Sequence, residues 1–160
     1  MKVLGIPPNE LATRQAVASD FDFAWELYAS NVRPLILPLM ERPWIDEGEK
    51  QRFSKIWAVT NSQIVLFDGA EIGWFTLTDG ENCIVIEQFY LKKSHQGKGI
   101  GRILVGFVTG AAAKTRRSVV AETLIGSTAN TFFKKAGFSE LGDAGITKQL
   151  EWKLNHERRQ

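Results

Sequence analysis

The sequence predicts a single α/β (α+β) domain in which helices flank a mixed, largely antiparallel sheet. Short Asp-Gly turns at residues 68–69 and 79–80 separate apolar runs and are typical of antiparallel hairpins. A strand over residues 82–91 then enters a glycine-rich loop that opens an amphipathic helix. The length of 160 residues, of which 44% are hydrophobic, suits one domain over residues 1–160 with a substantial core.

The composition narrows the classes of partner. Charged residues make up 24% of the chain and the formal net charge is +2, so the sequence lacks the basic stripe of a nucleic-acid-binding protein. This composition is more consistent with a small or anionic ligand than with nucleic acid. Histidines and carboxylates form no cluster with metal-ligand spacing, so we expect no metal. Cys83 is the single cysteine, which excludes an intramolecular disulfide and a cysteine-rich zinc site.

The expected compartment depends on two weaker observations. A lone cysteine points to a reducing environment. Residues 1–8 contain one lysine and no long apolar run, unlike a signal peptide or a membrane span. We therefore expect a soluble cytoplasmic protein with no membrane partner.

The N-terminal third predicts a strand, a helix and an irregular apolar segment. Residues 11–17 are expected to form the strand, and Ser19 or Asp20 can cap the helix, which should end before Pro34. The apolar positions of that helix recur at helical spacing: Phe21, Ala24, Trp25, Leu27 and Tyr28. Prolines interrupt the apolar segment at residues 34–45, which either lines a pocket or packs as a loop on the core.

The middle of the chain predicts a helix and three strands. The helix spans residues 46–57, and the strands span residues 63–67, 71–78 and 82–91. The third strand contains Ile-Val-Ile and Phe-Tyr-Leu runs, which are typical of a central strand buried on both faces.

Beyond the glycine loop the sequence predicts a helix packed against the sheet. From Ile100, its apolar positions follow the helical period: Ile103, Leu104, Phe107, Val108 and Ala111. A strand over residues 119–123, a helix over 128–135 that stops at Gly137, and a last strand within 151–154 complete the predicted elements.

The glycine loop has the chemistry of a diphosphate site. It reads Gln96-Gly97-Lys98-Gly99-Ile100-Gly101. A strand that ends in glycines and opens a helix gathers backbone N–H groups and the positive helix end around one point. Side chains in place of the glycines would occlude that concavity. Lys98 and Arg102 can reach outward to further phosphate charge.

Spacing excludes two familiar phosphate motifs. A Rossmann G-x-G-x-x-G would require glycine at Arg102 or at Leu104, and no G-x-x-x-x-G-K-[ST] is present. The pattern Q-x-x-G-x-G does fit, at Gln96, Gly99 and Gly101. It resembles the signature of the GNAT superfamily of acyl-CoA-dependent N-acetyltransferases. The strand IEQFYL, the loop HQGKGIG and the segment FFKKAGF extend this resemblance over most of the chain.

The resemblance implies acetyl-CoA as co-substrate, bound between two splayed parallel strands that end near Leu91 and Thr123. The backbone of Phe89, Tyr90 and Leu91 would pair with the pantetheine arm. The backbone of residues 97–102 would hold the pyrophosphate, with Lys98 or Arg102 on the remaining phosphate.

The chain departs from the family at two positions. Phe133 stands where many relatives carry the tyrosine that is thought to protonate the departing thiolate. Gly126 stands where relatives often have an asparagine that contacts the cofactor. Asn130 follows one helical turn later, and we assign it, with Phe133, to the cofactor-binding set.

Glu87 is the first candidate for the general base. It interrupts an apolar strand on the nominal face of Cys83, Val85, Phe89 and Leu91, and a buried acid requires a reason. It resembles the acid of the IED-type strand in glucosamine-phosphate acetyltransferases, which is placed to receive an amine proton. A structural carboxylate is the alternative, and Glu122 in the partner strand is the rival base.

Tyr90 is a candidate general acid on the opposite nominal face, so a bulge would be needed for it to share a cleft with Glu87. Ser127 and Thr128 are better explained as helix caps. Thiolate departure can also proceed without a protein acid, because a thiol pKa near 8.5 already makes a fair leaving group.

The expected reaction is therefore acetyl transfer from acetyl-CoA to an amine by direct attack in a ternary complex. The acceptor is a small molecule or a peptide amine. A non-catalytic acyl-CoA-binding or regulatory module is the alternative. The sequence leaves the oligomeric state open, with a homodimer among the options.

Overall fold

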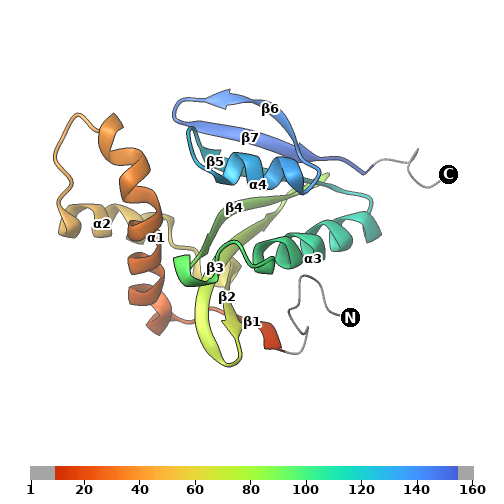
Figure 1. Ribbon diagram of the computed structural model, residues 1–160, viewed down its shortest axis with the longest axis horizontal. Helices are drawn as coiled ribbons and strands as arrows, with labels where there is room; N and C mark the ends of the chain where they lie inside the picture. The colour runs from red at the N-terminus through yellow and green to blue at the C-terminus, as the bar shows by residue number, and fades with distance from the viewer. Residues whose placement is uncertain (1–9, 155–160) are drawn as a thin grey trace.

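The computed structural model describes residues 10–154. The predictions for residues 1–8 therefore lie outside the described residues. The described chain folds into one seven-stranded sheet with helices on both faces (Figure 1). The predicted fold class is confirmed.

The sheet has the order β1-β2-β3-β4-β5-β7-β6. Its strands are β1 Leu11–Gln15, β2 Ser62–Phe67, β3 Ala70–Asp79, β4 Cys83–Leu91, β5 Ser118–Leu124, β6 Ser139–Ala144 and β7 Thr147–Trp152. Each neighbouring pair is antiparallel except β4 and β5, which run parallel. Helix α3 connects these two strands, as a parallel crossover requires.

Two helices cover each face of the sheet (Figure 1). They are α1 Phe21–Ile36, α2 Asp46–Ile56, α3 Ile100–Lys114 and α4 Ala129–Lys135. Adjacent strand residues point to opposite faces, so Ile64 and Trp74 pack under α1 and α2 while Val65 and Phe75 pack under α3. The α1 side is rich in aromatic rings, with Phe53 and Trp74 both almost fully buried.

Helix α1 continues through Pro34, where the sequence predicted its end. The prediction was wrong because Pro34 lies in the last turn, where a missing N–H removes a single helical hydrogen bond. The following turn still closes, since the Leu37 N–H donates to the Arg33 carbonyl. The irregular segment therefore begins later, with a short 3-10 turn over Leu37–Leu39.

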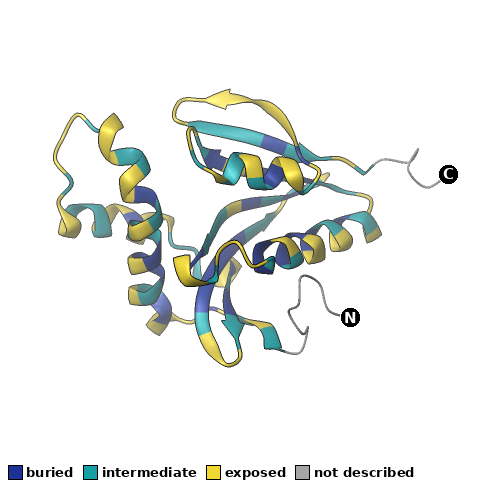
Figure 2. Cartoon of the chain, in the orientation of Figure 1, coloured by how far each residue is buried: buried dark blue, intermediate teal, exposed yellow. Residues whose placement is uncertain are grey.

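Two further predictions require correction. Phe107 does not pack against the sheet: it is 68% exposed, and the buried stripe of α3 instead includes Leu104, Val105, Val108 and Ala112 (Figure 2). Strand β6 was missed because its sequence, SELGDA, is exposed throughout and has no apolar alternation. The last strand, β7, also begins earlier than the predicted residues 151–154.

Candidate active site

The glycine loop delivers the chain to the start of α3 in a left-handed backbone conformation. Gly97 and Gly99 have φ of 73° and 88°, and Gly99 is the N-cap of α3. The first intrahelical bond runs from the Ile103 N–H to the Gly99 carbonyl. The preceding N–H groups in the first turn are therefore free for an anion, and the helix dipole favours negative charge there.

The loop requires glycine for a different reason at each position, which corrects the prediction that each glycine keeps a concavity open. A Cβ at Gly97 would meet nothing within 4 Å, so glycine is favoured there by φ and not by space. A Cβ at Gly101 would lie 3.2 Å from the ring of Phe132. Gly101 is buried, so its lack of a side chain lets α3 approach α4 closely.

Gln96 links the glycine loop to two neighbouring elements. Its side-chain amide donates to the Leu91 carbonyl at 2.8 Å and to Asn31 Oδ1 of α1 at 3.4 Å. The loop is thereby tied to the end of β4 and to α1. Sequence reasoning missed Asn31, and no local signal marks it, because the contact joins residues 65 positions apart.

The two predicted phosphate-binding cations differ in their surroundings. Lys98 is exposed beside the loop. Arg102 is also exposed, but its guanidinium donates to the Lys135 carbonyl at the end of α4, at 2.9 Å. Lys98 is thus the more available partner for a phosphate.

Strands β4 and β5 separate halfway along their length. They pair from Cys83 with Ser118 to Ile86 with Ala121, and in the described chain no further pair joins them. β4 nevertheless continues to Leu91 and β5 to Leu124. We call the region beyond Ile86 and Ala121 the splay. Its edges can hydrogen-bond an extended ligand that carries amide groups.

A β-bulge lies at the start of the splay, on Glu87 itself. Thr76 pairs with Gln88 and Leu77 pairs with Ile86, so Glu87 is the extra residue of β4. Glu87 is exposed, which overturns the premise that it is a buried acid and corrects the prediction of a strand buried on both faces. Among residues 10–154, no side-chain hydrogen bond or ion pair involves Glu87.

The bulge also changes which side chains share a face. Beyond it, Phe89 and Leu91 pack on the α3 side, while Tyr90 packs on the α1 side. The nominal face that placed Glu87 with Phe89 and Leu91 was therefore wrong. The bulge that Tyr90 would need in order to share a cleft with Glu87 is present.

Tyr90 lies among the aromatic rings on the α1 side of the sheet. Its hydroxyl donates to Gln88 Oε1 at 2.5 Å, and its ring meets Tyr28 edge-on at 5.7 Å. Burial, followed by the influence of Tyr28, raises the pKa of the Tyr90 phenol well above its usual range. A phenol with a raised pKa gives up its proton less readily, which weakens Tyr90 as a general acid.

Glu122 lies on β5 across the splay and is exposed. Its carboxylate accepts a long 3.5 Å hydrogen bond from the Gln149 amide of β7. Each of the two splayed strands therefore offers one exposed carboxylate, Glu87 on β4 and Glu122 on β5. Geometry alone leaves both in place as candidate bases.

The segment after β5 is fixed by local hydrogen bonds. Gly126 has φ of 87°, and Ser127 Oγ accepts a hydrogen bond from the Ala129 N–H at 3.1 Å, at the first residue of α4. Thr128 is the N-cap of α4, but its side chain makes no capping hydrogen bond, so of the two predicted caps only Ser127 bonds the helix start. Asn130 Oδ1 accepts from the Thr123 hydroxyl at 2.5 Å, and its amide donates to the Ser127 carbonyl. Asn130 thus holds the end of β5 to α4, and its amide is engaged with protein groups.

Phe133 lies in an aromatic cluster behind the splay. It is 3% exposed, and its ring centroid lies 5.0 Å from those of Phe132 and Phe138. Phe89 of β4 touches the same cluster, at 6.4 Å from Phe133. These rings pack α4 against β4, a role that needs no hydroxyl.

Two features are absent from residues 10–154. No group of three or more metal-ligating side chains occurs there. No helix in that range is long and apolar enough to cross a membrane.

The segment that contains the splayed strand β4, the glycine loop and the crossover helix α3 matches a family profile. Residues 53–140 fit the profile described as Acetyltransferase (GNAT) domain. The chain belongs to the GNAT acetyltransferase family. No curated protein sequence matches this GNAT protein.

Solved structures share the fold of this GNAT protein at low identity. PaiA N-acetyltransferase from Thermoplasma acidophilum, in complex with coenzyme A, has a TM-score of 0.73 at 16% identity, covering 90% of this chain and 99% of that chain. An acetyltransferase from Thermus thermophilus has a TM-score of 0.69 at 18% identity, covering 90% and 97%. N-acetylglutamate synthase from Neisseria gonorrhoeae, with coenzyme A and N-acetyl-glutamate, has a TM-score of 0.59 at 18% identity, covering 91% and 35%.

Proposed function

We propose that this GNAT protein transfers the acetyl group of acetyl-CoA to an amine by direct attack in a ternary complex. The observation that carries the proposal is the position of Glu87. It is an exposed carboxylate on a bulge, at the point where β4 and β5 stop pairing. The glycine loop follows at the end of the same strand, so one strand links the proposed pyrophosphate site to the proposed base.

The proposed cofactor path follows from the geometry of the splay. Backbone N–H groups at the start of α3 would bind the pyrophosphate, and Lys98 would bind further phosphate charge. The backbone of β4 over residues 89–91 would pair with the amides of the pantetheine arm. A backbone N–H in the splay would polarise the thioester carbonyl.

In the proposed step, the amine nitrogen attacks the thioester carbonyl carbon. The C–N bond forms, the C–S bond breaks, and coenzyme A leaves as the thiolate. The amine proton passes to Glu87, directly or through water. Deprotonation of an amine with a pKa of about 10.4 costs about 4.6 kcal/mol at pH 7, so a base that accepts this proton would lower the barrier.

Replacement of Glu87 by glutamine tests the proposal. With coenzyme A release from a panel of amines as the assay, Glu87→Gln is expected to lower turnover at pH 7 by at least about a hundredfold, or about 2.7 kcal/mol in the barrier. The deficit should shrink as the pH rises, because more free amine is present in solution. Acetyl-CoA affinity and thermal stability should not change, since Glu87 is exposed.

Glu122→Gln is the matched control, because it changes an exposed carboxylate on the opposite strand of the splay. It should retain most of the activity. Full activity in Glu87→Gln together with a large loss in Glu122→Gln would transfer the role of base to Glu122.

A non-catalytic acyl-CoA-binding module remains the second candidate. The observation that favours it is Phe133, a residue of 3% exposure that supplies no hydroxyl at the position where the family resemblance implies a tyrosine. Such a module would bind acetyl-CoA but release no coenzyme A with any amine in the panel.

A cytoplasmic location is proposed on the ground of the single cysteine, which is free in the structure.

A further inference from the structure

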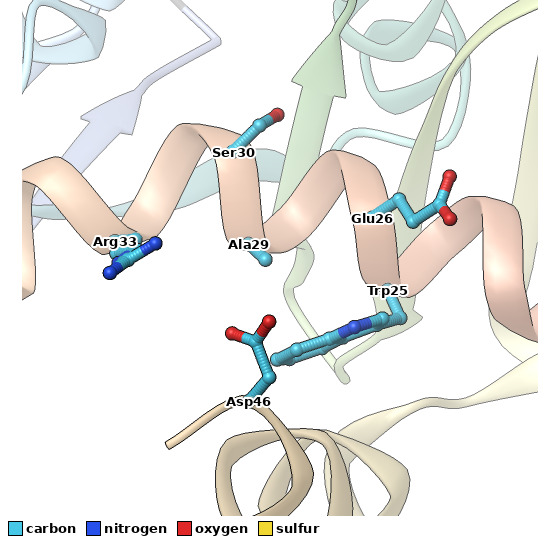
Figure 3. Close-up of a pocket in the computed structure, with 6 residues that line it drawn as sticks. All are labelled: Trp25, Glu26, Ala29, Ser30, Arg33 and Asp46. Carbon is cyan, nitrogen blue, oxygen red and sulfur yellow. The ribbon is translucent and has the colours of Figure 1, made fainter. Parts of the chain in front are cut away.

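A hollow lies between α1 and the start of α2, and none of the residues predicted for catalysis or cofactor binding line it. It is an open depression with a volume of about 230 Å³. Its lining residues are Trp25, Glu26, Ala29, Ser30, Arg33 and Asp46 (Figure 3). This volume is below the roughly 300–1,000 Å³ of pockets for drug-sized ligands, so it suits a smaller molecule.

The hollow and the splay lie on different faces of α1. The sheet-facing side of α1 is defined by three contacts: Ala24 accepts a hydrogen bond from the Trp74 indole, Tyr28 meets Tyr90, and Asn31 meets Gln96. The α1 residues that line the hollow alternate with these three along the sequence. Because a helix has 3.6 residues per turn, their side chains leave α1 on the side away from the sheet. Helix α1 therefore separates the hollow from the proposed transfer site.

One wall of the hollow is a rigid aromatic stack. The Trp25 ring is 7% exposed and stacks on Trp44 with centroids 6.2 Å apart and an interplanar angle of 15°. The Trp44 indole donates to Asp46 Oδ1 at 2.6 Å, and the Arg33 guanidinium lies 5.8 Å above the Trp44 ring. Trp44 thus orients both charged side chains at the opening, one acidic and one basic.

The opening carries charges of both signs that do not neutralise each other. Within the described chain, Arg33 and Asp46 form no ion pair with each other, and Glu26 forms none with any residue. Figure 3 shows Arg33 and Asp46 extending on the same side of α1 as the Trp25 ring. A ligand with a carboxylate for Arg33 and an ammonium for Asp46 would satisfy both.

We propose that this hollow binds a small zwitterion, an α-amino acid with an apolar side chain. Its carboxylate pairs with the Arg33 guanidinium, its ammonium pairs with Asp46, and its side chain lies on Ala29 and Trp25. A purely cationic ligand would face Arg33, and a purely anionic one would face Asp46 and Glu26. The site is independent of the proposed acetyl transfer, because α1 stands between the two.

Calorimetry with capped ligands tests the pairing of charges. L-Leucine and L-phenylalanine are titrated into the full chain, followed by leucinamide, which lacks the carboxylate, and N-acetyl-L-leucine, which lacks the ammonium. The free amino acids should bind, and each capped form should bind about fivefold more weakly, the factor that one favourable exposed ion pair supplies. Equal binding of all forms would overturn the proposal.

Two variants locate the site. Arg33→Gln should weaken L-leucine binding about fivefold without changing the affinity for leucinamide, which lacks the carboxylate. Asp46→Asn should weaken L-leucine binding by a similar factor without changing the affinity for N-acetyl-L-leucine, which lacks the ammonium. Asparagine keeps an oxygen for the Trp44 indole, so the aromatic stack should survive. Arg116→Gln is the matched control, because it removes an exposed arginine beyond the far end of α3.

Saturating coenzyme A separates this site from the splay. L-Leucine affinity should be the same with and without it. No binding of either free amino acid at about 10 mM, or loss of binding when coenzyme A is added, would refute the site. Neither result would bear on acetyl transfer, which is measured by coenzyme A release.

Discussion

The ion pair at the start of α1 offers a quantitative test of what anchors that helix to the sheet. The Asp20 carboxylate is 5% exposed and accepts two hydrogen bonds from Arg14 of β1, at 2.8 and 2.9 Å, and one from the Val17 N–H at 2.8 Å. Arg14 also donates to Glu71 of β3. Arg14 of β1 therefore joins the buried carboxylate at the start of α1 to Glu71 of β3.

Asp20→Asn removes the charge and preserves the size. Charge-assisted hydrogen bonds contribute about 1.5–3 kcal/mol each, but Arg14 is partly exposed and would keep Glu71, so we expect a loss of about 2–3 kcal/mol in the free energy of unfolding. For a domain of this length that corresponds to a fall of roughly 5–10 °C in melting temperature. Urea and thermal denaturation at pH 7 measure both quantities.

The effect should depend on pH in a defined direction. The hydrogen bonds from Arg14, together with the Val17 N–H, lower the pKa of Asp20 below its usual value of 3.8. A carboxylate with a lowered folded-state pKa stabilises the fold above its unfolded pKa, and this stabilisation is lost as the pH falls through the folded-state pKa. The gap between wild type and Asp20→Asn should therefore narrow in acid.

Asp79→Asn is the matched control for this prediction. Asp79 accepts a 2.7 Å hydrogen bond from Arg117, but its side chain is 80% exposed, so its loss should cost less than about 1 kcal/mol. Equal destabilisation by the two variants would refute the reasoning that burial gives the Asp20 pair its strength.

Three further predictions concern the glycine loop, the aromatic cluster and α3. Saturating acetyl-CoA should stabilise the wild type by about 2.7 kcal/mol at one hundred times its dissociation constant, and Gly99→Asp should abolish that shift in a thermal melt, because an aspartate requires a strained φ and repels phosphate. Phe133→Tyr buries a hydroxyl among packed rings and should cost about 1–3 kcal/mol in urea denaturation; unchanged stability with faster turnover would instead place that hydroxyl at the leaving sulfur. Phe107→Ser should change stability by less than about 0.5 kcal/mol, whereas Leu104→Ala should cost about 2–5 kcal/mol, and similar values for the two would contradict the burial pattern of α3.

Local sequence signals were sufficient for the elements that depend on neighbouring residues. The turn at Asp68-Gly69 and the loop from Gln96 to Gly101 were predicted because glycine conformations and helix starts are encoded within a few positions. The resemblance carried by those residues then implied the splay, which the pairing of β4 and β5 confirms.

Features that depend on distant partners escaped prediction. Strand β6 has no apolar face of its own and is held by its pairing with β7. The exposure of Phe107 could not be read from helical spacing, because neighbouring positions such as Val105 and Ala112 compete for the same inward stripe. The hollow beside α1 brings Asp46 of α2 to Arg33, a juxtaposition set by how the two helices pack.

The bulge at Glu87 gives β4 two halves that are out of phase with each other. Before it, even-numbered Ile84 and Ile86 face α3, and after it, odd-numbered Phe89 and Leu91 do so. Regular alternation through all nine residues of β4 would carry Tyr90 from the α1 layer to the α3 layer, whereas deletion of Glu87 would restore regular pairing and leave Tyr90 on the α1 side. The presence of one extra residue, and not the side chain that it carries, therefore sets which side chains of the second half of β4 face each helix layer.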